Sequence, residues 1–205
     1  MSYEIELIRK DQLEVSKWSG GTTTQLAIFP KDAIYSEHNF KWRLSSAKVE
    51  VEESVFTSLP NINRIIMIIE GELILEHEGH HRSILKSFNQ DHFSGSWKTK
   101  SFGKVIDFNL MMNEGCEGEL EAIHLEKEQS NMISFDNKKE FSQNVQAIYC
   151  VNGQIKIKIS ADDMITLYEG DIVLITPKND FSDLDFKVYN EKNRKADLII
   201  ASISY

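Results

Sequence analysis

Short runs of apolar residues, alternating or continuous, follow one another along most of the chain. They are rich in β-branched residues and are separated by Gly, Pro and Asn turns, which is typical of strands. Helical periodicity is nearly absent, and only residues 10–15 and 138–142 could hold a short helical turn. The pattern predicts an all-β sandwich or barrel. The expected strands are residues 22–29, 41–51, 64–69, 72–77, 80–85, 104–111, 118–125, 145–151, 154–159, 164–167, 172–175, 186–188 and 198–204.

The second half of the chain repeats the first. Gly71 and Gly153 lie 82 positions apart, and the same offset places residues 66–69 on 148–151 without a gap. A long unit repeated only twice indicates a duplicated barrel rather than a solenoid. The stretch EGDIVLITP at 169–177 resembles the G-D-x-x-x-x-x-P stretch of cupins. We therefore expect a bicupin, with an N-terminal barrel over 1–112 that carries the ligand pocket and a C-terminal barrel over 113–205, packed as one globular unit.

Composition and charge narrow the class of partner. The 205 residues include 32 Asp and Glu against 23 Lys and Arg, a net charge of −9. Such an acidic chain repels nucleic acid and anionic lipid, so neither is expected as a partner. Cys116 and Cys150 form no metal-binding spacing, the acidic N-terminus has no apolar signal segment, and the longest apolar run has five residues. These features predict a cytoplasmic protein with reduced thiols.

The histidines give no metal signature. The chain has 6 His and no His-x-His pair, the spacing that would place two imidazoles on one face of a strand. His77, His80 and His81 cluster around the turn Glu78-Gly79, where polar residues are ordinarily solvated. We therefore predict no metal site and no cofactor.

Charged and amide residues interrupt three predicted strands of the first half. Period-two alternation puts Arg43 and Ser45 on one face with Ala47 and Val49, an unfavourable place for a guanidinium unless it meets an anion. An edge strand with Arg43 in solvent is the alternative. Arg64 has the parity of the apolar residues at 66 and 68.

The strand at 104–111 continues the pattern. Alternation places Asp107 and Asn109 on one face of this otherwise apolar segment. Hydrogen-bonding groups there could face a ligand. Alternatively, Asp107 could pair with Arg43 or Arg64 and serve only the fold.

Taken together, several motifs resemble the HutD/Ves family of bacterial proteins. They are W-x-G-G-x-T-x-Q-L at 18–26, W-R-x-S-x-A-x-V at 42–49, F-T-x-L-P-x-I-x-R at 56–64, Glu-Gly at 70–71, F-x-G at 93–95 and D-F-N-x-M at 107–111. The resemblance implies a cytoplasmic bicupin without a catalytic metal, linked to histidine utilisation or to cold and stress responses. It also implies a sensor or modulator that binds an acidic intermediate of histidine breakdown, such as urocanate or formylglutamate. The chain departs from the family pattern at Ser19 and over residues 93–96, where family members often carry Phe-Asp-Gly-Asp.

Three functional hypotheses follow. The first is a non-catalytic binding protein in which Arg43 and Arg64 clamp the carboxylate of a small acidic metabolite, a geometry that the planar guanidinium favours. The second is a metal-independent isomerase or lyase with Asp107 as general base. The third is a structural bicupin whose arginines are merely paired. The Ile-rich faces of the second barrel could support a homodimer. In the first hypothesis Thr22, Gln25, Ser45 and Asn109 complete the hydrogen bonds, and Trp18 and Phe93 form an apolar wall.

Overall fold

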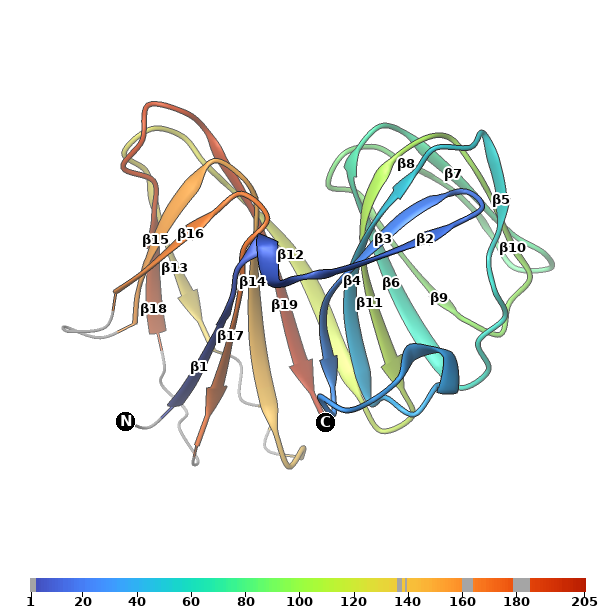
Figure 1. Ribbon diagram of the computed structural model, residues 1–205, viewed down its shortest axis with the longest axis horizontal. Coiled ribbons are helices and arrows are strands. Elements are labelled where there is room, and N and C mark those ends of the chain that lie inside the picture. Colours follow the sequence, from blue (N-terminus) through green and yellow to red (C-terminus); the bar gives the residue numbers. More distant parts are fainter. Residues whose placement is uncertain (1–2, 136–137, 139, 160–163, 179–184) are drawn as a thin grey trace. The chain divides into compact units, whose positions relative to one another are not determined.

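The computed structural model describes residues 3–135, 138, 140–159, 164–178 and 185–205. The chain divides into two compact units. One is Leu13–Cys116, here called the N-terminal barrel; the other is Glu117–Tyr205 together with Met1–Gln12, here called the C-terminal barrel. Each is built almost entirely of strands, which Figure 1 labels in chain order.

The N-terminal barrel consists of two antiparallel sheets. The six-stranded sheet has the order β2-β3-β4-β11-β6-β9, and the four-stranded sheet has the order β5-β10-β7-β8. The six-stranded sheet comprises β2 Glu14–Trp18, β3 Gly21–Phe29, β4 Trp42–Val49, β11 Ile106–Asn113, β6 Ile62–Glu70 and β9 Gln90–Ser94. The four-stranded sheet comprises β5 Glu53–Val55, β10 Thr99–Phe102, β7 Leu73–His77 and β8 Arg82–Leu85.

The C-terminal barrel has the same two-sheet arrangement. Its five-stranded sheet has the order β1-β17-β14-β19-β12, and its four-stranded sheet has the order β13-β18-β15-β16. The first sheet comprises β1 Tyr3–Ile8, β17 Ile172–Pro177, β14 Asn144–Asn152, β19 Ala196–Ser204 and β12 Glu117–Leu125. The second comprises β13 Ser130–Ser134, β18 Asp185–Tyr189, β15 Gln154–Lys158 and β16 Met164–Tyr168.

The structure confirms the internal repeat. The run β9-β6-β11-β4 in one barrel corresponds to β17-β14-β19-β12 in the other, and β5-β10-β7-β8 corresponds to β13-β18-β15-β16. The turn glycines are equivalent too: Gly71 has φ +93° and Gly153 has φ +77°. A Cβ atom would lie 2.6 Å from the Lys104 carbonyl oxygen at Gly71 and 2.9 Å from that of Lys195 at Gly153. Both turns therefore require glycine for conformation and for space.

The division of the chain differs from the expected one at the N-terminus. Residues before Leu13 belong to the C-terminal barrel, because β1 pairs with β17 over Tyr3–Ile8. The Asp171 carboxylate fixes the end of this segment by accepting hydrogen bonds from Arg9 Nη1 at 2.6 Å and from the Lys10 amide at 3.0 Å. The boundary between the halves falls after Cys116, four residues beyond the expected one.

Local predictions were accurate for long strands and poorer elsewhere. The turn expected at 10–15 is a 3-10 helix over Lys10–Gln12, which Leu13 connects to β2. At 138–142 no helix occurs in the described residues, although residue 139 lies outside them. Six strands were not predicted, since they are short, polar or lack clear alternation: β1, β2, β5, β9, β10 and β13. In the described part of the chain, no helix is long and apolar enough to span a bilayer.

Candidate functional site

Neighbouring strands bring the predicted polar residues together inside the N-terminal barrel. On β4 and β11, Ser45 stands opposite Asn109 and Arg43 opposite Met111. On β6, Arg64 also stands opposite Met111. Residues directly opposite one another in an antiparallel pair project to the same face. The face predicted from alternation is therefore present, and Arg43 is buried on it (5% exposed) rather than solvated.

This face lines a cavity of about 310 Å³. That volume is at the lower end of the range for small-molecule sites. Six of the nine predicted ligand-binding residues line it: Trp18, Arg43, Ser45, Arg64, Asp107 and Asn109. Asp107 is the one carboxylate among the described lining residues.

Thr22, Gln25 and Phe93 do not line the cavity. Thr22 stands opposite Lys48 on β4, whereas Thr23 stands opposite Ala47 and lines the cavity with it. The structure thus places Thr23, and not Thr22, on the cavity side of β3. Gln25 instead contacts Arg43, and Phe93 contacts Arg64. Both residues therefore support the arginines of the cavity wall without lining the cavity.

Arg64 is held by aromatic rings rather than by a carboxylate. Its guanidinium carbon lies 4.7 Å from the centroid of Phe56 and 5.1 Å from that of Phe93. Its side-chain Nε is buried and has no hydrogen-bond partner among the residues that the structure describes. Burial lowers the pKa of Arg64 to about 10, so it remains a cation at neutral pH. A buried guanidinium with an unused N–H group is unfavourable unless something else completes its hydrogen bonds.

Arg43 is held by neutral partners. Its Nε donates to the Gln25 side-chain oxygen at 2.9 Å, and its Nη1 donates to Ser45 Oγ at 3.2 Å. Its guanidinium carbon lies 4.2 Å from the centroid of the Tyr35 ring. Burial lowers the pKa of this arginine as well. These contacts orient the guanidinium and leave its charge without a bonded anion among the described residues.

Asp107 does not form an ion pair with either arginine in the described structure. Its Oδ1 accepts a hydrogen bond from the Ala47 amide at 3.3 Å. Burial raises the pKa of this carboxyl to about 7, against the opposing effects of Arg64 and the Ala47 amide. Nearby, Asn109 Oδ1 is buried and accepts no hydrogen bond from any described residue. The cavity wall thus holds both an unused donor and an unused acceptor.

The C-terminal barrel shows that the fold does not require these polar groups. Asp107 stands opposite Ile68 on β6. The residue of β14 equivalent to Ile68 is Cys150, and it stands opposite Leu198, so Leu198 takes the place of Asp107. By the same correspondence Asn109 is replaced by Ile200. The replacements are buried in an apolar cluster. The same barrel therefore forms twice in one chain. At these positions the interior is polar in the N-terminal barrel and apolar in the C-terminal barrel.

Sequence reasoning missed several lining residues. Phe56 belongs to the motif at 56–64 and could have been chosen by that motif. Tyr35, which lies in a short 3-10 helix outside the strands, gave no pattern that points to the cavity. Other lining residues not predicted are Ser16, Thr23, Ser54, Val55, Thr57 and Met111.

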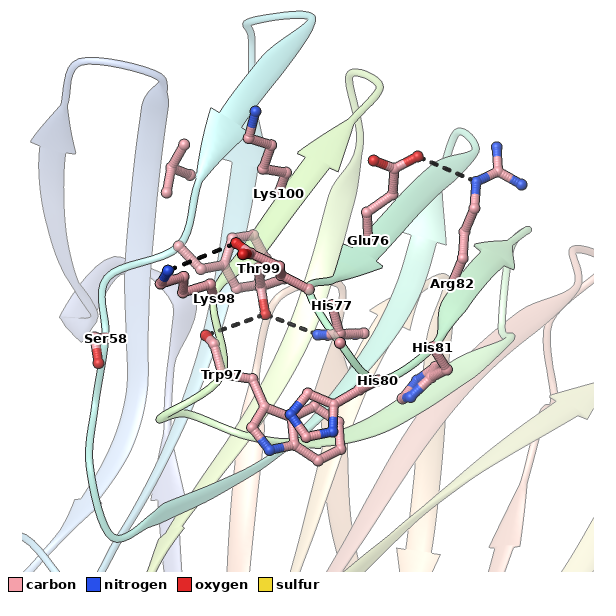
Figure 2. A pocket seen from close by; sticks show the side chains of 14 residues that line it. Ser58, Glu76, His77, His80, His81, Arg82, Trp97, Lys98, Thr99 and Lys100 are labelled. Atoms are coloured by element: carbon pink, nitrogen blue, oxygen red, sulfur yellow. Dashed lines mark hydrogen bonds and ion pairs between the residues drawn. The ribbon is translucent and has the colours of Figure 1, made fainter.

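The interpretation of the three histidines as a solvated turn was wrong for His77. That residue ends β7 and is 3% exposed, because its side chain points inward and packs against Phe93 with ring centroids 4.6 Å apart. A second cavity of about 820 Å³ lies beside it (Figure 2). Alternation along 72–77 would have put His77 on the face of Leu73 and Leu75, which are buried.

Solved structures share the two-barrel β fold of this chain. The oxalate decarboxylase of Bacillus subtilis, in an S161A variant, superposes with a TM-score of 0.63 at 8% identity over 97% of this chain and 76% of that one. A conserved protein of unknown function from Pseudomonas aeruginosa PAO1 gives 0.78 at 18% identity, over 98% and 100%. At these identities the likeness concerns the fold. The predicted all-β bicupin fold is confirmed.

The family follows from the sequence itself. The HutD family profile matches residues 10–194, so the chain belongs to the HutD family. The structure of HutD from Pseudomonas fluorescens SBW25 has a TM-score of 0.66 and 20% identity, covering 97% of this chain and 98% of that one. No curated protein sequence matches the chain significantly.

Proposed function

We propose that the protein is a non-catalytic receptor for a small carboxylate metabolite, bound in the cavity of the N-terminal barrel. The observation that carries the proposal is the state of Arg64: a buried cation whose Nε has no partner in the described part of the chain. A carboxylate entering the cavity supplies both the charge and the acceptor that this group lacks.

The charge balance of the cavity supports the same conclusion. Two guanidinium groups face one carboxyl, and the pKa of that carboxyl is raised to about 7 by burial. Even with Asp107 ionised, one positive charge is uncompensated. An anionic ligand restores neutrality, which a neutral ligand would not do.

The cavity also suggests the kind of acid. Its volume of about 310 Å³ suits a compact molecule, and Asn109 Oδ1 is an acceptor that a ligand N–H group can satisfy. Urocanate and formylglutamate each combine a carboxylate with an N–H group. Membership of the HutD family makes an intermediate of histidine breakdown our preferred ligand. In this account the protein reports the level of that intermediate in the cytoplasm.

A thermal-shift screen tests the proposal. The wild-type protein is melted with urocanate, formylglutamate, glutamate and formate, each over a concentration series. A receptor for carboxylates is stabilised by at least one of them in a saturable way. Methyl esters of the same acids are the matched controls, because they keep shape but lose the charge. Equal effects of acid and ester, or no effect of any acid, would exclude the proposal.

A second candidate function rests on Asp107. A carboxyl with a pKa near 7 is suited to accept and return a proton at neutral pH, as a general base does. In that case the protein is a metal-independent isomerase or lyase. Incubating each acid with the protein in D₂O and following its C–H signals by NMR separates the two functions. Exchange that depends on Asp107 indicates an enzyme, and its absence for a bound acid indicates a receptor.

A further inference from the structure

We propose that His77, His81 and Asp91 form a binding site for a divalent transition metal beside the second cavity. One ligand atom from each residue lies within 4.8 Å of the others. His77 Nε2 is 3.1 Å from Asp91 Oδ2, and His81 Nε2 is 3.0 Å from Asp91 Oδ1. Ligand atoms around tetrahedral zinc, with bonds of about 2.0 Å, are roughly 3.3 Å apart. The three side chains therefore need only small shifts to enclose a cation.

Two imidazoles and one carboxylate are a recognised ligand set for zinc and other first-row metals. Three protein ligands leave at least one coordination position open. The exposure of the site fits this: the His77 side chain is fully buried, that of Asp91 is 11% exposed and that of His81 is 40% exposed. His81 also lines the cavity of about 820 Å³, through which a metal and its remaining ligand can enter.

The surroundings of His77 prepare its Nε2 to bind a metal. Its Nδ1 is 2.7 Å from Thr99 Oγ1, and that hydroxyl can donate to the Trp97 carbonyl at 3.4 Å (Figure 2). In the metal-free chain Nε2–H donates to Asp91 Oδ2, 3.1 Å away. A bound metal takes the place of that proton, and Nδ1–H can then donate to Thr99 Oγ1. Metal-ligating histidines are usually held in this way through their other nitrogen.

Aromatic packing holds the two ligating rings in place. The rings of His77 and His81 have centroids 4.6 Å apart, and Trp97 contacts both, at 5.5 and 5.7 Å. His80 stacks on Trp97 at 3.8 Å. His80 is therefore close to the site, yet it lies outside the group of three that can share a cation.

The repeat provides an internal comparison. The offset of 82 places His77 on Ile159 and Asp91 on Val173, both buried in the core of the C-terminal barrel. Asp91 stands opposite Ile66, and Val173 stands opposite the equivalent Ile148, which confirms the correspondence. The barrel folds with apolar residues at these positions, so the fold alone does not explain a buried His–Asp pair. The proposal replaces the sequence-based expectation that no metal binds here.

Cobalt(II) and zinc titrations test the site in the full chain, purified without an affinity tag and freed of metal with EDTA. The d–d absorption of Co²⁺ reports coordination by nitrogen and oxygen ligands without any assay of activity. We expect one equivalent of Co²⁺ to bind and one equivalent of Zn²⁺ to displace it. His81→Ala and Asp91→Asn should each weaken Co²⁺ binding by tenfold or more, and Thr99→Val by 10- to 100-fold.

Two variants are matched controls. His80→Ala removes an imidazole from the same turn, and Arg64→Met alters the other cavity; both should bind Co²⁺ as the wild type does. Circular dichroism of each metal-free variant checks its fold, and the half-exposed His81 carries the test if the buried Asp91 variant does not fold. Substoichiometric Co²⁺ in the wild type would overturn the proposal. So would equal losses in His80→Ala and His81→Ala, which would indicate surface imidazoles only.

Discussion

Arg64 in the N-terminal barrel and Gln146 in the C-terminal barrel occupy equivalent positions of equivalent strands. Each is the third residue of its strand, β6 or β14. Gln146 donates to Ser202 Oγ on the neighbouring strand at 3.3 Å, and its buried Oε1 has no partner among the described residues. Arg64 stands opposite Met111, and its buried Nε likewise has no partner among them. The two barrels thus place a polar side chain at one point, and only the N-terminal barrel makes it a cation beside a cavity.

Replacing Arg64 with Met tests this difference. Met fills a similar volume without the charge, so the variant should fold and be at least as stable as the wild type when no ligand is present. Acids at about a hundredfold above Kd should stabilise the wild type by about 2.7 kcal/mol and leave Arg64→Met unchanged. Melting temperature with and without acid is the measurement. Gln146→Met is the matched control and should respond to acids as the wild type does; loss of the response in both variants would contradict the assignment.

The outline of this site could be predicted because alternation is local. Parity alone placed Arg43 and Arg64 on apolar faces, and strand pairing then turned those faces toward one cavity. The internal repeat could also be predicted from the sequence, since aligning the two turn glycines is enough to reveal it.

The meeting of His77 with Asp91 could not be predicted. These residues lie on β7 and β9, which belong to different sheets, so no spacing along the chain relates them. The same holds for β1, whose place in the C-terminal barrel depends on pairing with a strand more than 160 residues away. Thr22 illustrates a third reason why a site residue can be mispredicted: an error of one position along a strand moves the side chain to the opposite face of the sheet.

Asp107→Asn should change the pH dependence of stability. The folded-state pKa of Asp107 is raised from 3.8 to about 7 by burial, so between these values the folded state binds its proton more tightly than the unfolded chain. Stability contributed by this group therefore falls as pH rises from about 4 to about 7. Asn cannot ionise, so the variant should lose less stability than the wild type over this interval. Urea denaturation at several pH values measures it, and parallel profiles for the two proteins would show that Asp107 does not titrate in this range.

Asp171→Asn should destabilise the C-terminal barrel by about 1–3 kcal/mol. The carboxylate accepts hydrogen bonds from Arg9 and from the Tyr168 and Lys10 amides. Burial acts to raise the pKa of Asp171, but these hydrogen bonds lower it overall, so its contribution is present above pH 3.8 and lost as pH falls.

The destabilisation by Asp171→Asn is measured as the decrease in the midpoint of urea denaturation at neutral pH. Glu169→Gln is the control, because Glu169 is exposed and its one ion pair with a described residue is a long contact with Lys10, 3.6 Å. It should leave the midpoint nearly unchanged. A larger effect at Glu169 than at Asp171 would refute this account of how the N-terminal segment is held.

Gly71→Ala and Gly79→Ala separate backbone conformation from crowding. Both glycines have positive φ, +93° and +78°, so alanine costs roughly 1–2 kcal/mol at either from conformation alone. At Gly71 the new Cβ would also lie 2.6 Å from the Lys104 carbonyl oxygen, whereas at Gly79 no atom of a described residue lies within 4 Å. Gly71→Ala should therefore lower the melting temperature more than Gly79→Ala. Equal decreases in melting temperature for the two variants would mean that the backbone at Lys104 shifts away from the new Cβ at no cost in stability.

Isothermal titration calorimetry of the wild-type protein and Arg64→Met with urocanate, formylglutamate, glutamate and formate decides whether Arg64 binds a carboxylate. We expect saturable binding of at least one acid to the wild type, with one site per chain, and no measurable binding of that acid by Arg64→Met. The claim is contradicted if none of the four acids binds the wild type, or if Arg64→Met binds the same acid with the same affinity.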